Sequence, residues 1–320
     1  MTRQPNHSMH AWTLTDGHAG NVRQAEALAD ALGLTTPQAW TLQARPPWRW
    51  AAPRRLPLAI HAFGPVFAQA LDTPPTLAIG CGRQAALATR VLRERGAHSI
   101  QILDPRIDSR HWDWVIVPEH DGLHGPNVLT LLGSLNPVDD GWLADAREHF
   151  PAFALLPQPR TAVLLGGDSA HARFDVDAFE RLASLLQRTL ERDGGSLLVT
   201  TSRRTPAPVR ALLTDRFAHL PGHVWCSDAD GPNPYPGLLA WADRIVCTAD
   251  SVNMVSEACA TPSPVHVFEP GQVSGRPRRF LDAMLANGRV HAASEGLSAF
   301  NVTPLRETAR IAALLRERMP

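Results

Sequence analysis

The clearest structural signal in the chain is the stretch ADRIVCTADSVNMVSEACA, residues 242–260. Within it, Ile245–Thr248 is an apolar, partly β-branched run with the length of one buried strand. A polar, serine-bearing turn follows, and the pattern then predicts a helix from about Val252 to Ala260. A second apolar run, Val265–Phe268, comes shortly afterwards. A strand, a helix and a second strand in so short a segment are typical of a parallel sheet.

The same alternation extends over the rest of the chain and predicts two doubly wound, Rossmann-like α/β domains. We expect them over residues 1–150 and 158–302, with 303–320 completing the first. A linker is expected over 140–158, where prolines interrupt a weak pattern. The other predicted strands are Ala11–Leu14, Thr76–Ile79, Ser99–Leu103, Trp114–Val117, Ala162–Leu165, Leu197–Thr200 and Val224–Cys226, and the other predicted helices cover 22–32, 83–95, 176–193 and 305–318.

Composition excludes several classes of function. The 320 residues have a formal net charge of +0, so the chain lacks the global positive charge typical of proteins that bind nucleic acid, and any anion site must be local. All 31 basic residues are arginine, which excludes Schiff-base lysine chemistry and a P-loop lysine. The four cysteines show no metal-site spacing, so we expect buried thiols and no metal. Without an apolar run near the ~18 residues of a membrane span, we expect a cytoplasmic protein.

Ligands of an open parallel sheet bind beyond the carboxyl ends of its strands, so the residues directly after each predicted strand are the site candidates. Glycines there let the backbone approach a ligand, and a helix N-terminus beside an arginine attracts anions. Ordinary turn chemistry is the alternative. In the first domain, the candidates for acceptor or phosphate contacts are Gly17, Gly20, Asn21, Gly82 and Arg83.

The second domain carries a similar set. Gly166, Gly167 and Ser169 follow one predicted strand, and Arg203 follows the next. Backbone N–H groups and hydroxyls in such loops can hold phosphate. The glycines match neither GxGxxG nor GxxxxGK[ST], so the sequence predicts neither a dinucleotide fingerprint nor a Walker loop.

A resemblance to a known class rests on these residues. The strand, the serine-bearing turn, Ser256-Glu257-Ala258 and the segment PVHVF at 264–268 look like the donor-binding half of GT-B glycosyltransferases, notably the peptidoglycan N-acetylglucosaminyltransferase group. This resemblance implies two domains facing a cleft and a nucleotide whose ribose hydroxyls are held by Glu257. The nucleotide-binding set that it implies is Gly166, Gly167, Ser169, Asp250, Ser251, Ser256 and Glu257.

Nearly the whole chain also resembles the mitochondrial-fission factor family of plants and its bacterial relatives. The resemblance rests on GCGR at 80–83, PEHD at 118–121, NVL at 127–129, LGG at 165–167 and the region 250–261, with Asp16-Gly17 and Gly20-Asn21. It implies, for the plant members, recruitment of a dynamin-type GTPase to the mitochondrial surface. Fission itself is not transferred to this lysine-free, bacterial-looking chain.

Two functions from different classes follow. The first is metal-free transfer of a sugar from a nucleotide-sugar donor, held by the second domain, to an unknown acceptor held by the first, with no cofactor required. Arginines and helix N-termini would stabilise the leaving diphosphate. Asp16, Glu119 or His120 would be the catalytic base, and His120 is preferred because histidine ordinarily titrates nearest neutrality. The second is a non-catalytic scaffold with a protein partner, for which the proline-rich stretch 45–57 is the best docking candidate, or else an acceptor lid.

Overall fold

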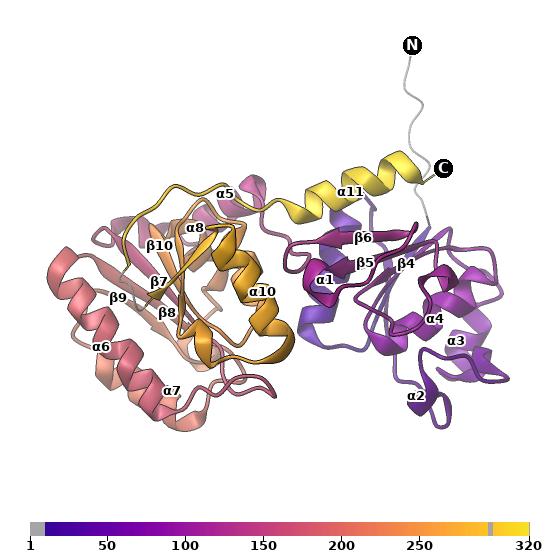
Figure 1. Ribbon diagram of the computed structural model, residues 1–320, viewed down its shortest axis with the longest axis horizontal. Coiled ribbons are helices and arrows are strands. Elements are labelled where there is room, and N and C mark those ends of the chain that lie inside the picture. The colour runs from indigo at the N-terminus through magenta and orange to yellow at the C-terminus, as the bar shows by residue number, and fades with distance from the viewer. Residues whose placement is uncertain (1–9, 294–296, 320) are drawn as a thin grey trace, which may run out of the picture. The chain divides into compact units, whose positions relative to one another are not determined.

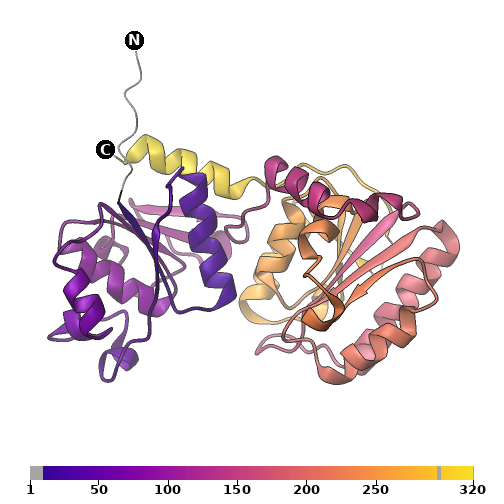
Figure 2. The ribbon, with the colours of Figure 1, turned by 180° about the vertical axis from the view of Figure 1, so that it is seen from behind.

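The computed structural model describes residues 10–293 and 297–319. Contacts within the chain divide it into two compact units. Unit 1 comprises Met1–Pro137 with Glu307–Pro320, and unit 2 comprises Val138–Arg306. Each unit contains one parallel sheet flanked by helices (Figures 1 and 2).

Unit 1 is built on a six-stranded sheet with the order β2-β1-β3-β4-β5-β6, in which all neighbouring strands are parallel. The chain runs from β1 to β2 on one side and then returns to β3 on the other. The gap between β1 and β3 is therefore the topological switch point, where doubly wound sheets bind ligands. The strands are β1 Ala11–Thr15, β2 Gln38–Thr41, β3 Leu77–Cys81, β4 His98–Ile102, β5 Trp114–Pro118 and β6 Val128–Leu131.

The last helix of the chain belongs to unit 1. It packs against the first helix, and its residue Glu307 accepts a hydrogen bond from the Leu132 N–H at 2.8 Å. The Asn136 N–H likewise donates to the Thr308 hydroxyl at 2.9 Å. The helices of unit 1 are α1 Ala19–Ala31, α2 Trp48–Ala51, α3 Pro65–Ala70, α4 Arg83–Arg93 and α11 Glu307–Arg318, with short 3-10 turns η1 Ala59–His61, η2 Ser109–His111 and η3 Glu119–Asp121.

Unit 2 has the order β12-β11-β10-β7-β8-β9, again parallel throughout the described strands. Counted within the unit, this is the Rossmann order with its switch point between β7 and β10. The strands are β7 Arg160–Leu165, β8 Ser196–Thr201, β9 Gly222–Trp225, β10 Arg244–Thr248, β11 Val265–Phe268 and β12 Val290–Ala292, and the helices are α5 Asp140–His149, α6 Val176–Asp193, α7 Ala207–Phe217, α8 Tyr235–Trp241, α9 Val252–Cys259 and α10 Gly275–Ala286.

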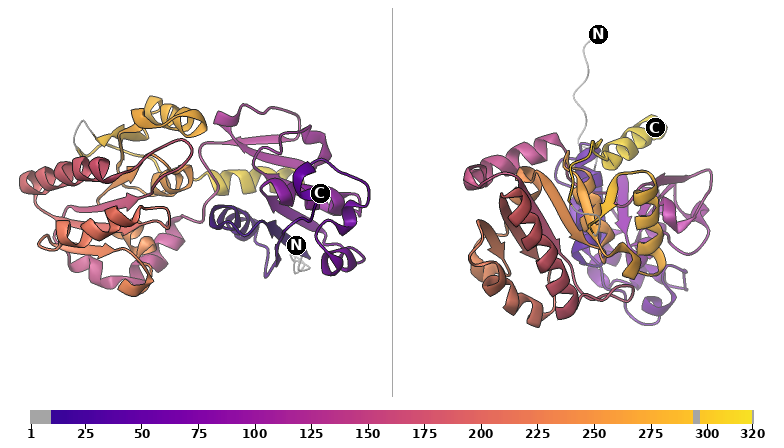
Figure 3. Two further views of the ribbon diagram at one scale, coloured as in Figure 1. Left: turned by 90° about the horizontal axis from the view of Figure 1, so that it is seen from below. Right: turned by 60° about the vertical axis from the view of Figure 1, so that its left-hand side comes forward.

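The core of unit 2 explains why its strands are apolar at every position. In β7, Ala162 and Leu164 belong to the cluster under α5, α8, α9 and α10, whereas Val163 and Leu165 belong to the cluster under α6 and α7 (Figure 3). Alternate residues of a strand point to opposite faces, and both faces are covered here. The continuous apolar runs that predicted the strands are therefore the signature of a sheet buried on both sides.

The prediction of two doubly wound domains is confirmed, and the predicted helix 176–193 and strand 265–268 have the observed bounds. The linker expected over 140–158 is instead folded, because α5 and the 3-10 turn η4 Pro151–Leu155 occupy most of it. The boundary of the units lies between Pro137 and Val138. Asp139 caps α5 by accepting from the Trp142 N–H at 2.8 Å, and α5 packs on α8.

Candidate functional site

Asp250 lies at the switch point of unit 2, directly after β10, and its side chain is only 2% exposed. Its Oδ1 accepts from the Thr248 hydroxyl at 2.6 Å, and its Oδ2 accepts from the Gly167 N–H at 3.1 Å. Arg204, from the loop after β8, donates to the same Oδ2 at 2.6 Å. A buried carboxylate requires such partners. The loops after β7, β8 and β10 therefore converge on one buried charge.

The glycine pair after β7 makes this convergence possible. A Cβ on Gly166 would lie 2.0 Å from Asp250 Oδ1, and a Cβ on Gly167 would lie 2.0 Å from the carbonyl oxygen of Arg204. The Gly166 N–H donates to the Thr248 hydroxyl at 2.8 Å. The two N–H groups that the sequence suggested for phosphate are thus hydrogen-bonded within the unit, and close packing explains why both residues are glycine.

The turn between β8 and α7 directs Arg204 toward this carboxylate. Its last residue, Thr205, places Oγ1 at 2.5 Å from the Gly166 carbonyl oxygen and accepts from the Ser202 N–H at 3.0 Å. Arg203 in the same turn is exposed. The sequence singled out Arg203, but Arg204 is the arginine that the turn brings to the switch point.

The serines of the predicted nucleotide site all have local structural bonds. Ser169 Oγ accepts from the N–H groups of His171 and Ala172 at 3.2 and 3.1 Å. Ser251 is the N-cap of α9 and accepts from the Met254 N–H at 3.4 Å. The Ser256 hydroxyl donates to the Val252 carbonyl within α9 at 2.7 Å. Ser169 and Ser251 shape the loops beside Asp250, and Ser256 is buried in the helix.

Glu257 lies in α9 and is 3% exposed. Its Oε2 accepts a hydrogen bond from the hydroxyl of Tyr235, the first residue of α8. Arg289, also buried, holds the far end of α9 by donating to the carbonyls of Cys259 at 2.8 Å and Thr261 at 2.9 Å. Burial lowers the pKa of Arg289. A cation at a helix C-terminus complements the helix dipole, so α9 and its glutamate are fixed from both ends.

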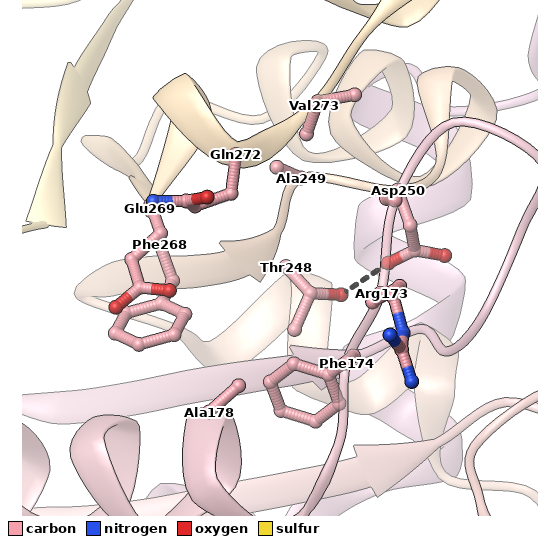
Figure 4. Close-up of a pocket in the computed structure, with 11 residues that line it drawn as sticks. Arg173, Phe174, Ala178, Thr248, Ala249, Asp250, Phe268, Glu269, Gln272 and Val273 are labelled. Atoms are coloured by element: carbon pink, nitrogen blue, oxygen red, sulfur yellow. Dashed lines mark hydrogen bonds between the residues drawn. The ribbon is translucent and has the colours of Figure 1, made fainter.

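A small cavity adjoins Asp250 at the ends of β10 and β11 (Figure 4). Thr248 and Asp250 point toward one another in its wall, and the exposed Arg173 and half-buried Glu269 also line it. Its volume is about 20 Å³, which is room for about one water molecule. The cavity is therefore too small for a ligand much larger than water.

A second polar cluster lies at the switch point of unit 1. Asp16 Oδ1, after β1, accepts from the Asn21 amide at 2.9 Å and from the His18 N–H at 3.1 Å. Burial acts to raise the pKa of Asp16, but the hydrogen bonds of Asn21 and His18 outweigh it and the pKa is lowered. Gly82, at φ +92°, follows β3, and a Cβ there would lie 2.7 Å from Asn21 Nδ2. The structure thus brings Asp16, Asn21 and Gly82 together.

The remaining candidates of this loop have roles in its backbone conformation. Gly17 has φ +81°, a left-handed conformation that suits glycine, and Gly20 lies in the first turn of α1, which begins at Ala19 rather than near Val22. The N-cap position is His18, so Asn21 is left to bind Asp16. Asp16 in turn holds the loop that leads into α1.

The other candidates of unit 1 lie elsewhere. Arg83 donates to the carbonyls of Ala52 and Arg49, both at 3.2 Å, and so fixes the loop around α2. Glu119 and His120 form the short turn η3 after β5. Because β3 and β4 lie between β1 and β5, this turn is three strand spacings from Asp16, roughly 14 Å. The three base candidates therefore do not form one catalytic group.

The described residues also bear on metal binding, on membrane insertion and on site residues that the sequence did not reveal. Among the described residues, no group of three or more His, Cys, Asp and Glu side chains is arranged to hold a metal ion. No helix in the described ranges is both long and apolar enough to cross a membrane. Sequence reasoning missed Arg173 and Tyr235 as members of the site of unit 2, although Tyr235 is the single tyrosine of the chain.

Two doubly wound domains, each with a polar cluster at the switch point of its sheet, define a protein of the GT-B fold. Solved structures agree, at identities that concern the fold alone. UDP-GlcNAc 2-epimerase from Methanocaldococcus jannaschii matches with a TM-score of 0.55 at 11% identity, covering 96% of this chain and 99% of that one. Rice (O. sativa) Os79 in complex with UDP has a TM-score of 0.54 at 12% identity, covering 96% and 91%. Acinetobacter baumannii MurG has 0.50 at 14%, covering 97% and 99%.

The chain belongs to the mitochondrial fission ELM1 family, whose model matches residues 19–319. The mitochondrial fission protein ELM1 of Arabidopsis thaliana is 29% identical over 278 residues, which is 77% of this chain and 64% of that protein. The chain thus spans less than two thirds of the length of the plant relative. An uncharacterized protein of Rickettsia prowazekii (strain Madrid E), RP120, is 24% identical over 354 residues, 96% of this chain and 98% of its own.

Proposed function

We propose that unit 2 binds the nucleoside diphosphate part of a nucleotide sugar and that the protein transfers the sugar to an acceptor without a metal. The observation that carries this proposal is the switch point between β7 and β10, where Arg204 is fixed on the buried carboxylate of Asp250 and α9 begins. An arginine held by a carboxylate presents its charge without losing side-chain freedom on binding. The GT-B neighbours solved with UDP or UDP-GlcNAc support a uridine nucleotide as the probe.

In this proposal the diphosphate lies along the open edge, near the guanidinium groups of Arg204 and Arg173. The N-terminus of α9 adds its dipole. Gly166 and Gly167 support the site through Asp250, because their N–H groups already have partners. Glu257 takes the ribose hydroxyls, for which it must exchange the hydroxyl of Tyr235.

Chemistry at the acceptor requires a base in unit 1. Asp16 has a lowered pKa, so it is ionised at neutral pH and accepts a proton weakly. Its hydrogen bonds to Asn21 and His18 suit an orienting role for an acceptor hydroxyl. His120 remains our preferred base, with Glu119 beside it, and loss of a general base lowers turnover by about 10²- to 10⁴-fold.

Titration calorimetry with UDP tests the nucleotide site. Glu257→Gln should weaken UDP binding by about tenfold or more, because a charged acceptor is lost. Tyr235→Phe should leave affinity equal or stronger, because it frees Glu257 from its present donor. Glu148→Gln, an exposed position on α5, is the matched control and should bind as wild type does. Equal affinity of Glu257→Gln and wild type removes Glu257 from the site, and no UDP binding by wild type defeats the proposal.

The second candidate is a GT-B protein that works through protein contacts and has lost catalysis. Two observations favour it: membership of the fission family, and the separation of Asp16 from Glu119 and His120 in the sheet of unit 1. A screen of UDP-sugars for release of UDP distinguishes the two. Release that falls in His120→Ala while the melting temperature is kept supports the transferase, and binding of UDP without release from any donor supports the scaffold.

A further inference from the structure

One long stretch of unit 1 contains no acidic residue. Between Asp30 and Asp72 the chain has neither aspartate nor glutamate, although its net charge over all residues is +0. The same stretch contains Arg45, Arg49, Arg54 and Arg55, all exposed. Of these four, Arg55 donates to Glu94 at 2.7 Å, and within the described residues the other three form no ion pair. A local positive field therefore exists on a protein that is neutral overall.

Large apolar side chains are exposed in the same segment of the chain. Trp50 is 73% exposed, Leu58 68% and Val66 71%. Among the described residues they account for three of the five large hydrophobic side chains that are exposed, and they fall within 17 positions of one another along a chain of 320. Single exposed apolar residues are ordinary, but several of them among exposed arginines in one short segment indicate an interaction surface.

These residues belong to one folded segment, residues 45–66, which we call the apolar-basic loop. The Arg45 N–H donates to the Ala62 carbonyl at 2.8 Å, and the Trp48 indole donates to the Pro57 carbonyl at 3.0 Å, so the loop closes on itself. The turn η1 packs on α3, which brings the part around Leu58 beside the helix that carries Val66. Figure 1 shows α2 and α3 beside α4 in unit 1.

Two arginines of α4 hold the loop through its carbonyl groups. Arg83 donates to the carbonyls of Arg49 and Ala52, and Arg90 donates to the Pro53 carbonyl at 2.7 Å. Leu58 has φ +58°, an unfavourable conformation for leucine, and it is held there with its side chain in solvent. These hydrogen bonds keep the loop in a conformation in which its apolar side chains stay in solvent, and a strained backbone of this kind is typical of functional segments.

We propose that the apolar-basic loop docks on an anionic lipid surface. A membrane of this kind satisfies both properties of the loop, because its negative headgroups attract arginine and its acyl boundary takes Trp, Leu and Val. Tryptophan in particular favours the headgroup level. Each arginine near such a surface contributes roughly a fivefold gain in affinity. The loop belongs to unit 1, whereas the proposed nucleotide site belongs to unit 2.

A lipid surface fits the loop better than an acidic protein does. Protein partners of high affinity bury aromatic anchors in pockets, and their interfaces are surfaces of matched shape. Here the exposed apolar side chains come from a short helix, from the residue before a 3-10 turn and from a second short helix, with exposed arginines between the first two in the sequence. Partial insertion into a fluid interface needs no shape match.

Vesicle flotation of the full chain tests the proposal. Wild type should float with vesicles of about 30 mol % phosphatidylglycerol in phosphatidylcholine, and binding should fall steeply when salt is raised. The double variant Trp50→Ser/Leu58→Ser should bind at least about tenfold less, since these side chains touch solvent and can be replaced without loss of core packing. Arg54→Gln should lower binding roughly fivefold. Leu155→Ser in unit 2, where the leucine is 87% exposed, is the matched control and should bind as wild type does.

Three outcomes overturn the proposal. They are absence of wild type from the phosphatidylglycerol vesicles, equal flotation of the double variant and wild type, and equal flotation with pure phosphatidylcholine. Retention of a soluble acidic protein by wild type, lost in the double variant while no vesicle binds, would assign the loop to a protein partner instead. Far-UV circular dichroism and the melting temperature of each variant show that any loss comes from the surface and not from unfolding.

Discussion

Gly166→Ala is the sharpest test of how the site of unit 2 is assembled. The new Cβ would lie 2.0 Å from Asp250 Oδ1, far inside van der Waals contact. The carboxylate must then move away from Thr248 and from the loop after β7. Its bonds of 2.6 Å to the Thr248 hydroxyl and 3.1 Å to the Gly167 N–H cannot both survive that movement.

The expected cost follows from these contacts. Forcing an extra carbon into a packed site costs about 1–3 kcal/mol, and a buried polar group that loses its partner costs about 1–3 kcal/mol more. We therefore expect unit 2 to lose about 3 kcal/mol of unfolding free energy or more. For a domain of this size, that corresponds to a fall in Tm of about 6–12 °C.

Scanning calorimetry measures the Tm, and hydrogen exchange of the amides in β7 and β10 shows where stability is lost. Gly141→Ala in α5 is the control, because the nearest atom to its Cβ would be Asp139 Oδ1 at an ordinary 3.4 Å and alanine favours a helix. It should melt at or slightly above the wild-type temperature. A Gly166→Ala protein that melts with wild type and keeps the same protection in β10 would refute the packing role of the glycine.

Two further predictions concern one buried contact in unit 2 and one carboxylate in unit 1. Arg289→Met should lower the unfolding free energy of unit 2 by about 3 kcal/mol in urea denaturation, because the carbonyls of Cys259 and Thr261 lose a buried charged donor, whereas Arg188→Met on the exposed side of α6 should change it by less than about 0.5 kcal/mol. The pKa of Asp16 in the folded protein is below its ordinary value of 3.8, so the stabilisation by this carboxylate is present above about pH 4 and is lost as the pH falls through the folded pKa. Asp16→Asn should therefore have a lower Tm than the wild type at pH 7, and the two Tm values should approach one another in acid. A difference in Tm that stays constant down to about pH 2 would contradict this.

The parts of the fold that the sequence predicted well are those in which local and tertiary signals agree. The β10 to β11 region combines a buried apolar strand, a short helix and a second apolar strand, and all three appear where expected. By contrast, α8 contains Pro236 and Gly237, which read as helix breakers. A Cβ on Gly237 would lie 2.6 Å from Phe150 Cγ, so the glycine serves the packing of α8 on the segment after α5. That contact joins residues far apart in the chain and gives no local signal.

Prediction of the candidate site was limited in the same way, by contacts between residues far apart in the chain. Position after a strand directed attention to Gly166, Gly167 and Asp250, because the topology of a parallel sheet fixes which edge they share. It did not reveal that the Gly167 N–H binds Asp250 itself and that the Gly166 N–H binds the Thr248 hydroxyl. It also led to Arg203, whereas Arg204 is the arginine that bonds Asp250, because that outcome depends on the turn that Thr205 closes.

The bond between Tyr235 and Glu257 gives this protein a built-in reporter. Because the chain has a single tyrosine, a fluorine-labelled or isotope-labelled tyrosine is present at one position, on the ring whose hydroxyl donates to Glu257 of α9. The chemical shift of a phenol responds strongly to the charge of its hydrogen-bond acceptor. Any molecule that displaces the Tyr235 hydroxyl from Glu257 will therefore change the chemical shift of the labelled tyrosine in the unmutated protein, whatever the chemical nature of that molecule.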